Sequence, residues 1–379
     1  MNARYDSIIV GARCAGAATA LLLARAGQRV LVVDRSDPGD DPLSTHALMR
    51  PAVLLLSQWG VLDRVIAAAT PPVRSASFHY GDALVDVPIK PRDGIDALYA
   101  PRRTVLDPAL IDAARAAGAE VHHHTKLREL ARDSSGRVCG AVVESGGVVS
   151  SVRAGLVIGA DGLGSAVARA VAAPATRTAR HATATIYAHV PGLAVDGYHW
   201  YYRPGVSAGV IPTNGGACVF ALAPSARFRT EPRDPDGWFR RVLAEAAPSV
   251  AERLAGVPLA LRPFRGRTGY VRRGSGAGWA LVGDAGCFRD PVTAHGITDA
   301  LRDAALLARE IIAGGLARYD AARDEFAIPM LEVTDAIASF GWNLDELGEL
   351  HRTLNREIAR ELELVRSFTL ADRVIANAS

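Results

Sequence analysis

The residues with the clearest capacity for chemistry stand near the N-terminus, in the segment Gly11-Ala-Arg-Cys-Ala-Gly16, with Asp34 placed 23 residues after Gly11. A glycine turn between a buried strand and a helix leaves N–H groups unpaired at the helix start, and these groups with the helix dipole hold a pyrophosphate. An acidic residue at the end of the next strand accepts hydrogen bonds from a ribose. The spacing therefore predicts a dinucleotide site that contains Gly11, Arg13, Cys14, Ala15, Gly16, Asp34 and Arg35.

Arg13 is a departure from the usual pattern, because it occupies the place of the middle glycine of G-x-G-x-x-G. That glycine normally lets the backbone approach the phosphates closely. An arginine can serve there if its side chain points outward or itself pairs with phosphate. The competing interpretation, an alanine-rich strand–helix unit with incidental glycines, is disfavoured by the placement of Asp34.

Two further motifs follow the same plan of a buried strand that ends in a glycine–aspartate turn. In the first, residues 156–160 run into Asp161-Gly162, and a helix is expected from Ser165. In the second, residues 278–282 run into Gly283-Asp284, a loop follows, and a long helix is expected over 297–313.

The elements around these motifs predict an α/β protein with a second lobe. Residues 73–95 alternate as a hairpin outside the nucleotide-binding part, residues 120–124 read as a strand, and residues 176–266 are rich in strand patterns. Residues 316–379 are predicted to be mostly helical, with a break at Pro329.

Composition narrows the class of protein. The chain has 379 residues, of which 49% are hydrophobic and 22% charged, and its net charge of +3 is too small to favour nucleic acid as a partner. No run of about 20 apolar residues predicts a membrane span, and no leader pattern is visible. The four cysteines are scattered without a C-x-x-C pair, so we expect a soluble, cytoplasmic protein without a disulfide framework.

Taken together, the motifs resemble those of FAD-dependent oxidoreductases of the para-hydroxybenzoate hydroxylase and geranylgeranyl reductase superfamily. The matching positions are Gly11 to Gly16 with Asp34, Arg103-Thr-Val-Leu-Asp107, Gly159-Ala-Asp161-Gly162 with Ser165 and Arg169, and Gly283-Asp284 with Asp290-Pro291 and Gly296. The resemblance implies a Rossmann-like FAD-binding domain, an inserted β-sheet substrate lobe and a C-terminal helical region. The expected boundaries are 1–72, 98–175 and 266–315 for the FAD-binding domain, 73–97 and 176–265 for the substrate lobe, and 316–379 for the helical region.

The resemblance also assigns cofactor contacts. Asp284 would accept hydrogen bonds from the ribityl hydroxyls, and the helix that begins near Gly296 would stabilise the negative charge of a reduced flavin. Arg103 would reach the FAD phosphates or ribityl chain, although a surface salt bridge to Asp107 is the alternative. His46 stands where related hydroxylases carry a flavin-contacting arginine, and a helix-capping role is the alternative. The other cofactor positions are Asp161, Gly162, Gly283, Pro291 and Ile297.

The sequence indicates the cofactor more closely than it indicates the reaction. The leading hypothesis is a monooxygenase that uses NADH or NADPH, without preference, and oxygen to act on a small aromatic or polyketide-like molecule. The alternatives are a reductase or dehydrogenase of C=C bonds, towards which Arg103–Asp107 and Gly209–Pro212 lean, and a non-catalytic flavin-binding protein. Halogenation is disfavoured because Trp-x-Trp-x-Ile-Pro is absent. The candidate substrate-pocket residues are Tyr80, Trp200, Tyr202 and His295, with Arg203 for an anionic group.

Other chemistry is weakly supported. His122 and His124 would share one strand face, but no cysteine or acidic residue has metal-ligand spacing, so no metal site is predicted. Cys14 and Cys287 lie near the predicted cofactor, where a redox role is less expected than small apolar filling. The sequence does not indicate an oligomeric state.

Overall fold

The computed structural model describes residues 4–230 and 234–376. Its first layer is a sheet with parallel central strands in the order β16-β17-β8-β1-β2-β5. The strands are β1 (Arg4–Val10), β2 (Val30–Val33), β5 (Glu120–His122), β8 (Val148–Gly159), β16 (Ser275–Gly276) and β17 (Trp279–Leu281). Short apolar runs form β2 and β17 and end β1 and β8, because both faces of the sheet are buried there. The predicted Rossmann-like α/β class is confirmed.

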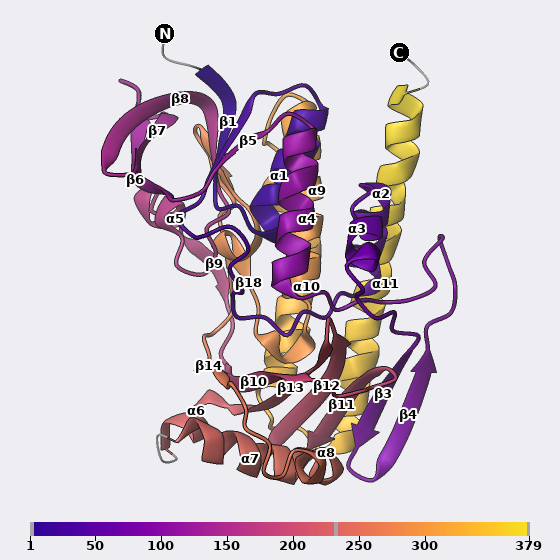
Figure 1. Cartoon of the computed structure of the whole chain (residues 1–379). Coiled ribbons are helices and arrows are strands. Elements are labelled where there is room, and N and C mark those ends of the chain that lie inside the picture. Colours follow the sequence, from indigo (N-terminus) through magenta and orange to yellow (C-terminus); the bar gives the residue numbers. More distant parts are fainter. Residues whose placement is uncertain (1–3, 231–233, 377–379) are drawn as a thin grey trace.

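The two faces of this sheet are covered differently (Figure 1). Helix α1 (Cys14–Arg25) contacts both α4 (Arg103–Ala116) and α9 (Gly296–Ile312) on one face. The other face carries β6 (Thr125–Arg132), β7 (Val138–Ser145) and α5 (Ala166–Ala170). Because side chains alternate along a strand, Ile9 packs with the helices and Ile8 with the hairpin, and both are fully buried. A small third sheet joins β9 (Ala175–Thr178), β15 (Tyr270–Arg272) and β18 (Cys287–Phe288).

A second, seven-stranded sheet lies below the first layer in Figure 1, in the order β14-β10-β13-β12-β11-β3-β4. Its strands are β3 (Ser75–Tyr80), β4 (Ala83–Pro88), β10 (Thr183–Pro191), β11 (Tyr198–Arg203), β12 (Val206–Thr213), β13 (Gly216–Pro224) and β14 (Arg262–Phe264). The outer face packs on α7 (Pro235–Ala246), between α6 (Ser225–Thr230) and α8 (Pro248–Arg253) in the chain. The inner face belongs to the same hydrophobic core as the helices of the first layer. This face of the sheet therefore packs against the helices of the first layer.

Helices α10 (Tyr319–Ala338) and α11 (Leu344–Ala376) complete the fold with the short α2 (Arg50–Gln58) and α3 (Leu62–Ala67). The predicted break at Pro329 is wrong, since α10 continues through it. Buried neighbours, including Phe326 and Met330, pack this helix against the core, and that packing offsets the hydrogen bond that a proline removes. The chain turns later, at Phe340, whose φ is 52°. The strand predicted over 120–124 ends at His122.

Helix α11 links the two layers. It starts at a reciprocal cap in which the Asn343 side chain accepts from the N–H of Glu346, and the Glu346 carboxylate accepts from the N–H of Asn343. Near this end His351 contacts the second sheet, and farther along the helix packs on α2 (Figure 1). Among the described residues, no helix is both long enough and apolar enough to cross a bilayer.

Candidate active site

A cleft of about 640 Å³ opens where the parallel strands end. Val10 and Val33 are the last residues of β1 and β2, and Ala160 and Asp284 follow β8 and β17; all four line the cleft. This is the position at which parallel α/β sheets bind ligands. The predicted cofactor residues in the lining are Gly11, Arg13, Cys14, Ala15, Asp34, Arg35, His46, Arg103, Asp161, Gly162, Asp284, Pro291, Gly296 and Ile297. Gly16 and Gly283 lie behind them.

The glycine turn has no room for larger residues. Gly11 has a φ of 108°, and a Cβ there would overlap the carbonyl oxygen of Ala160. A Cβ on Gly16 would overlap the carbonyl oxygen of Gly11. Arg13 precedes the first turn of α1 with an extended backbone and an exposed side chain, and that turn contains no acidic residue. The first N–H groups of α1 therefore face the cleft as an anion site, with Arg13 at its rim.

Asp34 closes the same end of the cleft. Its Oδ2 accepts from the N–H of Ala12 at 2.6 Å, and its Oδ1 accepts from the N–H of Ser36 at 2.8 Å. These bonds hold the buried carboxylate at the mouth of the turn, beside Arg35. Carboxylate oxygens accept more than one hydrogen bond, so lone pairs remain for a ribose.

Asp161 has a structural task at the next strand end. Its carboxylate accepts from the Ser165 hydroxyl at 2.5 Å and from the N–H of Ala166 at 2.6 Å. The hydroxyl oxygen of Ser165 in turn accepts from the N–H of Ala168. Asp161 thereby supports the start of α5 and fixes the Gly162 turn against the cleft.

Arg103 forms a buried ion pair, not the surface salt bridge that was the alternative. Its Nε and Nη2 donate to the two carboxylate oxygens of Asp107 at 3.0 and 2.8 Å. The thiol of Cys14 donates to the same carboxylate at 3.1 Å. Burial raises the pKa of the Cys14 thiol, and it raises the pKa of Cys287 to about 12. Both cysteines are therefore protonated thiols at neutral pH, as small filling residues would be.

Asp284 is the most strongly perturbed carboxyl group in the cleft. Burial, helped by the nearby Asp299, raises its pKa to about 7, although Arg103 and Arg289 pull it down. Among the described residues no side chain or N–H donates to its carboxylate. Helix α9 begins close by at Gly296, where a Cβ would meet nothing within 4 Å. A hydroxyl-rich ligand in the cleft would supply the hydrogen bonds that Asp284 lacks.

The raised pKa of Asp284 gives a stability prediction. A carboxyl with a pKa near 3.8 when unfolded and about 7 when folded stabilises the fold fully only below the lower value. This contribution is lost as pH rises towards 7, so Asp284→Asn should gain stability relative to the wild type over that range. The relative gain is at most about 4 kcal/mol, and denaturant unfolding of the cofactor-free proteins at pH 4 and pH 7 measures it. A difference that does not change with pH would contradict the assignment.

His46 also lines the cleft and meets a residue of the second sheet. Its Nε2 lies 3.1 Å from Nε2 of His189 on β10, and the two rings stack with centroids 4.9 Å apart. His46 has a φ of 70° and does not cap α2, whose N-cap is Met49. The capping alternative is therefore wrong.

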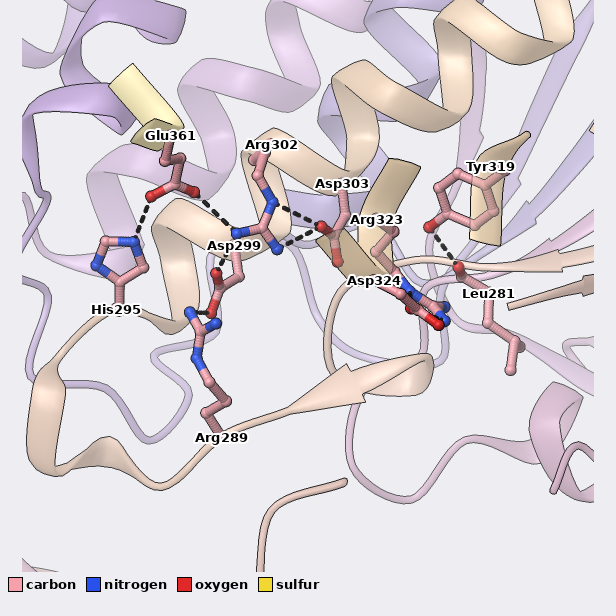
Figure 2. Close-up of polar contacts among 10 residues, drawn as sticks. All are labelled: Leu281, Arg289, His295, Asp299, Arg302, Asp303, Tyr319, Arg323, Asp324 and Glu361. Atoms are coloured by element: carbon pink, nitrogen blue, oxygen red, sulfur yellow. Dashed lines mark hydrogen bonds and ion pairs between the residues drawn. The ribbon is translucent and has the colours of Figure 1, made fainter. Parts of the chain in front are cut away.

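Behind α9 lies a buried network of charges that joins α9 to α11 (Figure 2). Arg302 donates to Asp299, to Asp303 and, at 2.9 Å, to Glu361. His295 bonds to the other oxygen of Glu361 at 2.6 Å. The imidazole of His295 with the carboxylates of Asp299 and Glu361 could hold a cation, but the Arg302 guanidinium already pairs with both carboxylates. The cluster is thus an ion-pair network.

The four substrate-pocket candidates do not line the cleft. The Tyr80 hydroxyl pairs with Nδ1 of His351 at 2.6 Å, and its ring stacks on Tyr202. Trp200 is buried in the shared core beside the sheet, and His295 is held by Glu361. Arg203 forms an exposed pair with Asp82.

Several residues in or beside the cleft were missed in the sequence. Arg289 lines the cleft with a buried side chain whose Nε and Nη1 have no partner among the described residues. A signal existed, because Arg289 lies in the loop between Asp284 and Gly296. His189, which contacts the cleft residue His46 without lining the cleft itself, had no such signal because it lies on the second sheet. Residues 125–127 line the cleft from the hairpin on the far side of β8 and had no such signal either.

These observations fit an FAD. The start of α1 offers an anion site for the pyrophosphate, and Asp34 lies where a ribose would follow. Elsewhere in the lining, Asp284 lacks donors, Gly296 leaves open space, and Arg289 has buried N–H groups without a partner among the described residues.

Known proteins agree with this geometry. The model of the FAD binding domain family matches residues 4–323. Menaquinone reductase of Mycolicibacterium smegmatis is 28% identical, over 85% of this chain and 80% of the relative. Digeranylgeranylglycerophospholipid reductase 2 of Methanopyrus kandleri is 29% identical, over 93% and 91% of the two chains.

Solved structures show the same fold. A flavin-dependent brominase superposes with a TM-score of 0.78 at 18% identity, covering 98% of this chain and 100% of the other. PqsL, a probable FAD-dependent monooxygenase from Pseudomonas aeruginosa, superposes with a TM-score of 0.74 at 19% identity, covering 92% and 100%. The chain therefore belongs to the FAD binding domain family and is an FAD-dependent oxidoreductase, of the group that contains monooxygenases, halogenases and reductases.

Proposed function

We propose that the protein is a reductase that adds hydrogen across a C=C bond of an apolar, polyisoprenoid-type molecule. The relatives that match most of the chain support this, because menaquinone and digeranylgeranylglycerophospholipid, after which they are named, share isoprenoid chains with C=C bonds. This was the alternative hypothesis at the sequence level, and we now place it first.

The observation that carries the proposal is the apolar inner face of the second sheet. Trp200, Ile211, Phe220 and Leu222 are all buried there, in one core with the helices that border the cleft. The Trp200 and Phe220 rings lie 5.6 Å apart within this core, next to the cleft and not in its lining. An apolar core beside the cleft would suit an alkene chain and would keep water away from the reacting bond.

The roles of the chain's own residues follow from their places in the cleft. The N-terminus of α1 would bind the pyrophosphate of FAD, and Asp34 its adenosine ribose. Asp284 and the start of α9 would orient the ribityl chain and the flavin ring. When bound, FAD supplies the hydride chemistry. Electrons would come from NADH or NADPH.

A second candidate is oxygenation of a small aromatic molecule, which was the leading hypothesis at the sequence level. The aromatic side chains on the inner face of the second sheet, in particular Trp200, Phe220 and the stacked Tyr80 and Tyr202, favour it. The likeness to a probable monooxygenase and to a halogenase supports the fold only, since their identity to this chain is low.

Oxygen separates the two candidates. We expect the FAD-loaded protein, reduced with NADPH or dithionite without air, to convert a short-chain menaquinone or geranylgeraniol into a product heavier by one H₂. With ¹⁸O₂ present, no label should enter the product. A small aromatic molecule is tested in parallel, and an aromatic product that contains ¹⁸O would establish the second candidate. If the reduced flavin transfers electrons neither to the isoprenoid probes nor to oxygen with the aromatic probe, both candidates are contradicted.

A further inference from the structure

Buried polar atoms without partners gather at one place, where the cleft meets β10. Among the described residues, Nδ1 of His46 and of His189 lack a hydrogen-bond partner, as do Oδ1 of Asp41 and Nε of Arg102. Thr185, two strand positions before Tyr187 and four before His189, has an unpartnered hydroxyl as well. Leaving buried polar groups unsatisfied costs free energy, so this group of unpartnered atoms indicates a functional site.

The two histidines form a connected unit. A contact of 3.1 Å between their Nε2 atoms requires one hydrogen to lie between them, while each ring keeps a free Nδ1. His46 is 1% exposed, and its φ of 70° fixes it in a turn. Because His46 lines the cleft and His189 belongs to the sheet, the unit connects the cofactor site with the substrate lobe.

The pair lies at the flavin end of the cleft. The loop that carries His46 is tied to α9 by the N–H of Met49, which donates to the Thr298 hydroxyl at 3.4 Å. Arg103 is close enough to both His46 and Asp284 for its charge to act on each of them, and all three line the cleft.

The charges around the pair determine its protonation. Burial lowers the pKa of His46, and so do His189 and the guanidiniums of Arg103, Arg102 and Arg262. Burial and the same Arg102 and Arg262 lower the pKa of His189 to about 4, although Asp41 acts in the opposite direction. Asp41 is itself held by both arginines, at 2.6 and 2.8 Å.

Tyr187 and Cys218 are the remaining titratable neighbours. The Tyr187 hydroxyl accepts from the N–H of Ser44 at 3.0 Å, and Cys218 lies opposite His189 on β13, where burial raises the pKa of its thiol. With protein charges alone, the pair is therefore neutral at pH 7. A negative charge placed beside it would favour its protonation, and a reduced flavin carries such a charge.

We propose that the His46–His189 pair is the proton donor that accompanies hydride transfer to the alkene, a role that rests on the proposed function. On reduction of the flavin the pair binds one proton, so that both Nδ1 atoms carry hydrogen and one proton is shared between the Nε2 atoms. The hydride, with both electrons, forms one C–H bond while the C=C π bond breaks. The Nδ1 proton of His46 forms the second C–H bond as the shared proton passes from His189 to His46. The pair is left neutral and the flavin oxidised.

Proton counting tests the first half of this inference without any substrate. We expect the FAD-loaded wild type to take up two protons per two electrons near pH 7, from the pH slope of its midpoint potential, while the absorption of the reduced flavin shows its anionic form. His46→Asn and His189→Asn should take up one. Asparagine is chosen at position 46 because it tolerates a positive φ. If His46→Asn fails to hold FAD, the proton uptake of His189→Asn tests the inference by itself, because the His189 side chain does not line the cleft.

A second histidine pair on the opposite face of the sheet gives the matched control. His79 and His199 approach to 3.4 Å between Nε2 and Nδ1, away from the cleft, so His79→Asn should keep the two-proton uptake. An uptake of one proton per two electrons by the wild type, or of two protons by both His46→Asn and His189→Asn, would overturn the inference.

The second half is measured as single-turnover alkene reduction by prereduced protein. Loss of a general acid should slow it by roughly 10²–10⁴-fold in the cleft variants, and His79→Asn should leave it unchanged. Unaltered rates in His46→Asn and His189→Asn would overturn the donor role. A wild type that takes up two protons but reduces no alkene would show that the proposed function has failed, whereas one that reduces alkenes with a single proton would show that the pair is not the donor.

Discussion

Replacing Gly16 with alanine is expected to give a protein that does not retain FAD and is less stable by about 1–3 kcal/mol. The new Cβ would overlap the Gly11 carbonyl oxygen and press on the Cβ of Ala160 at 3.1 Å. Both neighbours belong to the strand ends that carry the cleft, so α1 could accommodate the methyl group only by moving away from the sheet. The N–H groups that bind the pyrophosphate would move with it.

Denaturant unfolding and the ratio of flavin to protein absorbance measure the two effects of Gly16→Ala. Gly348→Ala is the matched control, because Gly348 lies inside α11 and a Cβ there meets nothing within 4 Å. Removing a glycine from a helix interior should stabilise the control by about 0.5–1 kcal/mol. A Gly16→Ala protein that binds FAD like the control would show that α1 is not seated as described.

The nucleotide half of the cleft could be predicted from the sequence because its signals are local. Gly11, Gly16 and Asp34 lie within one strand–helix–strand unit, where turn geometry and helix polarity restrict the residue types. The later aspartates at 161 and 284 could be placed for a related reason, since each ends a buried parallel strand and such ends meet at one edge.

The partners of these residues could not be predicted, because they are set by packing between distant segments. His46 meets His189, which is 143 residues away, and Tyr80 meets His351, which is 271 residues away. The sequence pattern shows that Trp200 and Tyr202 share one face of a strand, but it does not show whether that face carries a cavity or a helix. In the structure α11 covers part of it, through His351.

Pro329 wrongly predicted a helix break because contacts between distant segments overrode a local rule. The local rule is sound, since a proline removes one helical hydrogen bond. It was overridden because α10 is held by contacts with α9, α11 and β15 along its length. A helix fixed by its neighbours tolerates a cost that would end an isolated helix.

The second large effect is expected for Glu361→Gln, in the network that joins α11 to the start of α9. Glu361 is 1% exposed and accepts from His295 and Arg302 through its two oxygens. Burial alone would raise its pKa, but His295 and Arg302 outweigh burial and hold it at about 2. Breaking such a pair leaves the Arg302 charge only partly compensated, which costs about 3–5 kcal/mol. Because His295 directly precedes the first residue of α9, FAD retention should fall as well.

Glu363→Gln on the same helix is the control, since the Glu363 side chain is 64% exposed and pairs with Arg366. It should cost less than about 1 kcal/mol.

The pH dependence adds a second criterion. A carboxyl with a lowered folded pKa stabilises the fold above its unfolded value, near 4.5, and this advantage disappears as pH falls through about 2. Urea unfolding of both variants at pH 7 and at decreasing pH should show the Glu361→Gln deficit shrinking with acid. A deficit that persists to the lowest pH would mean that Glu361 contributes packing and not charge, and that α9 does not depend on the ion pairs that join it to α11.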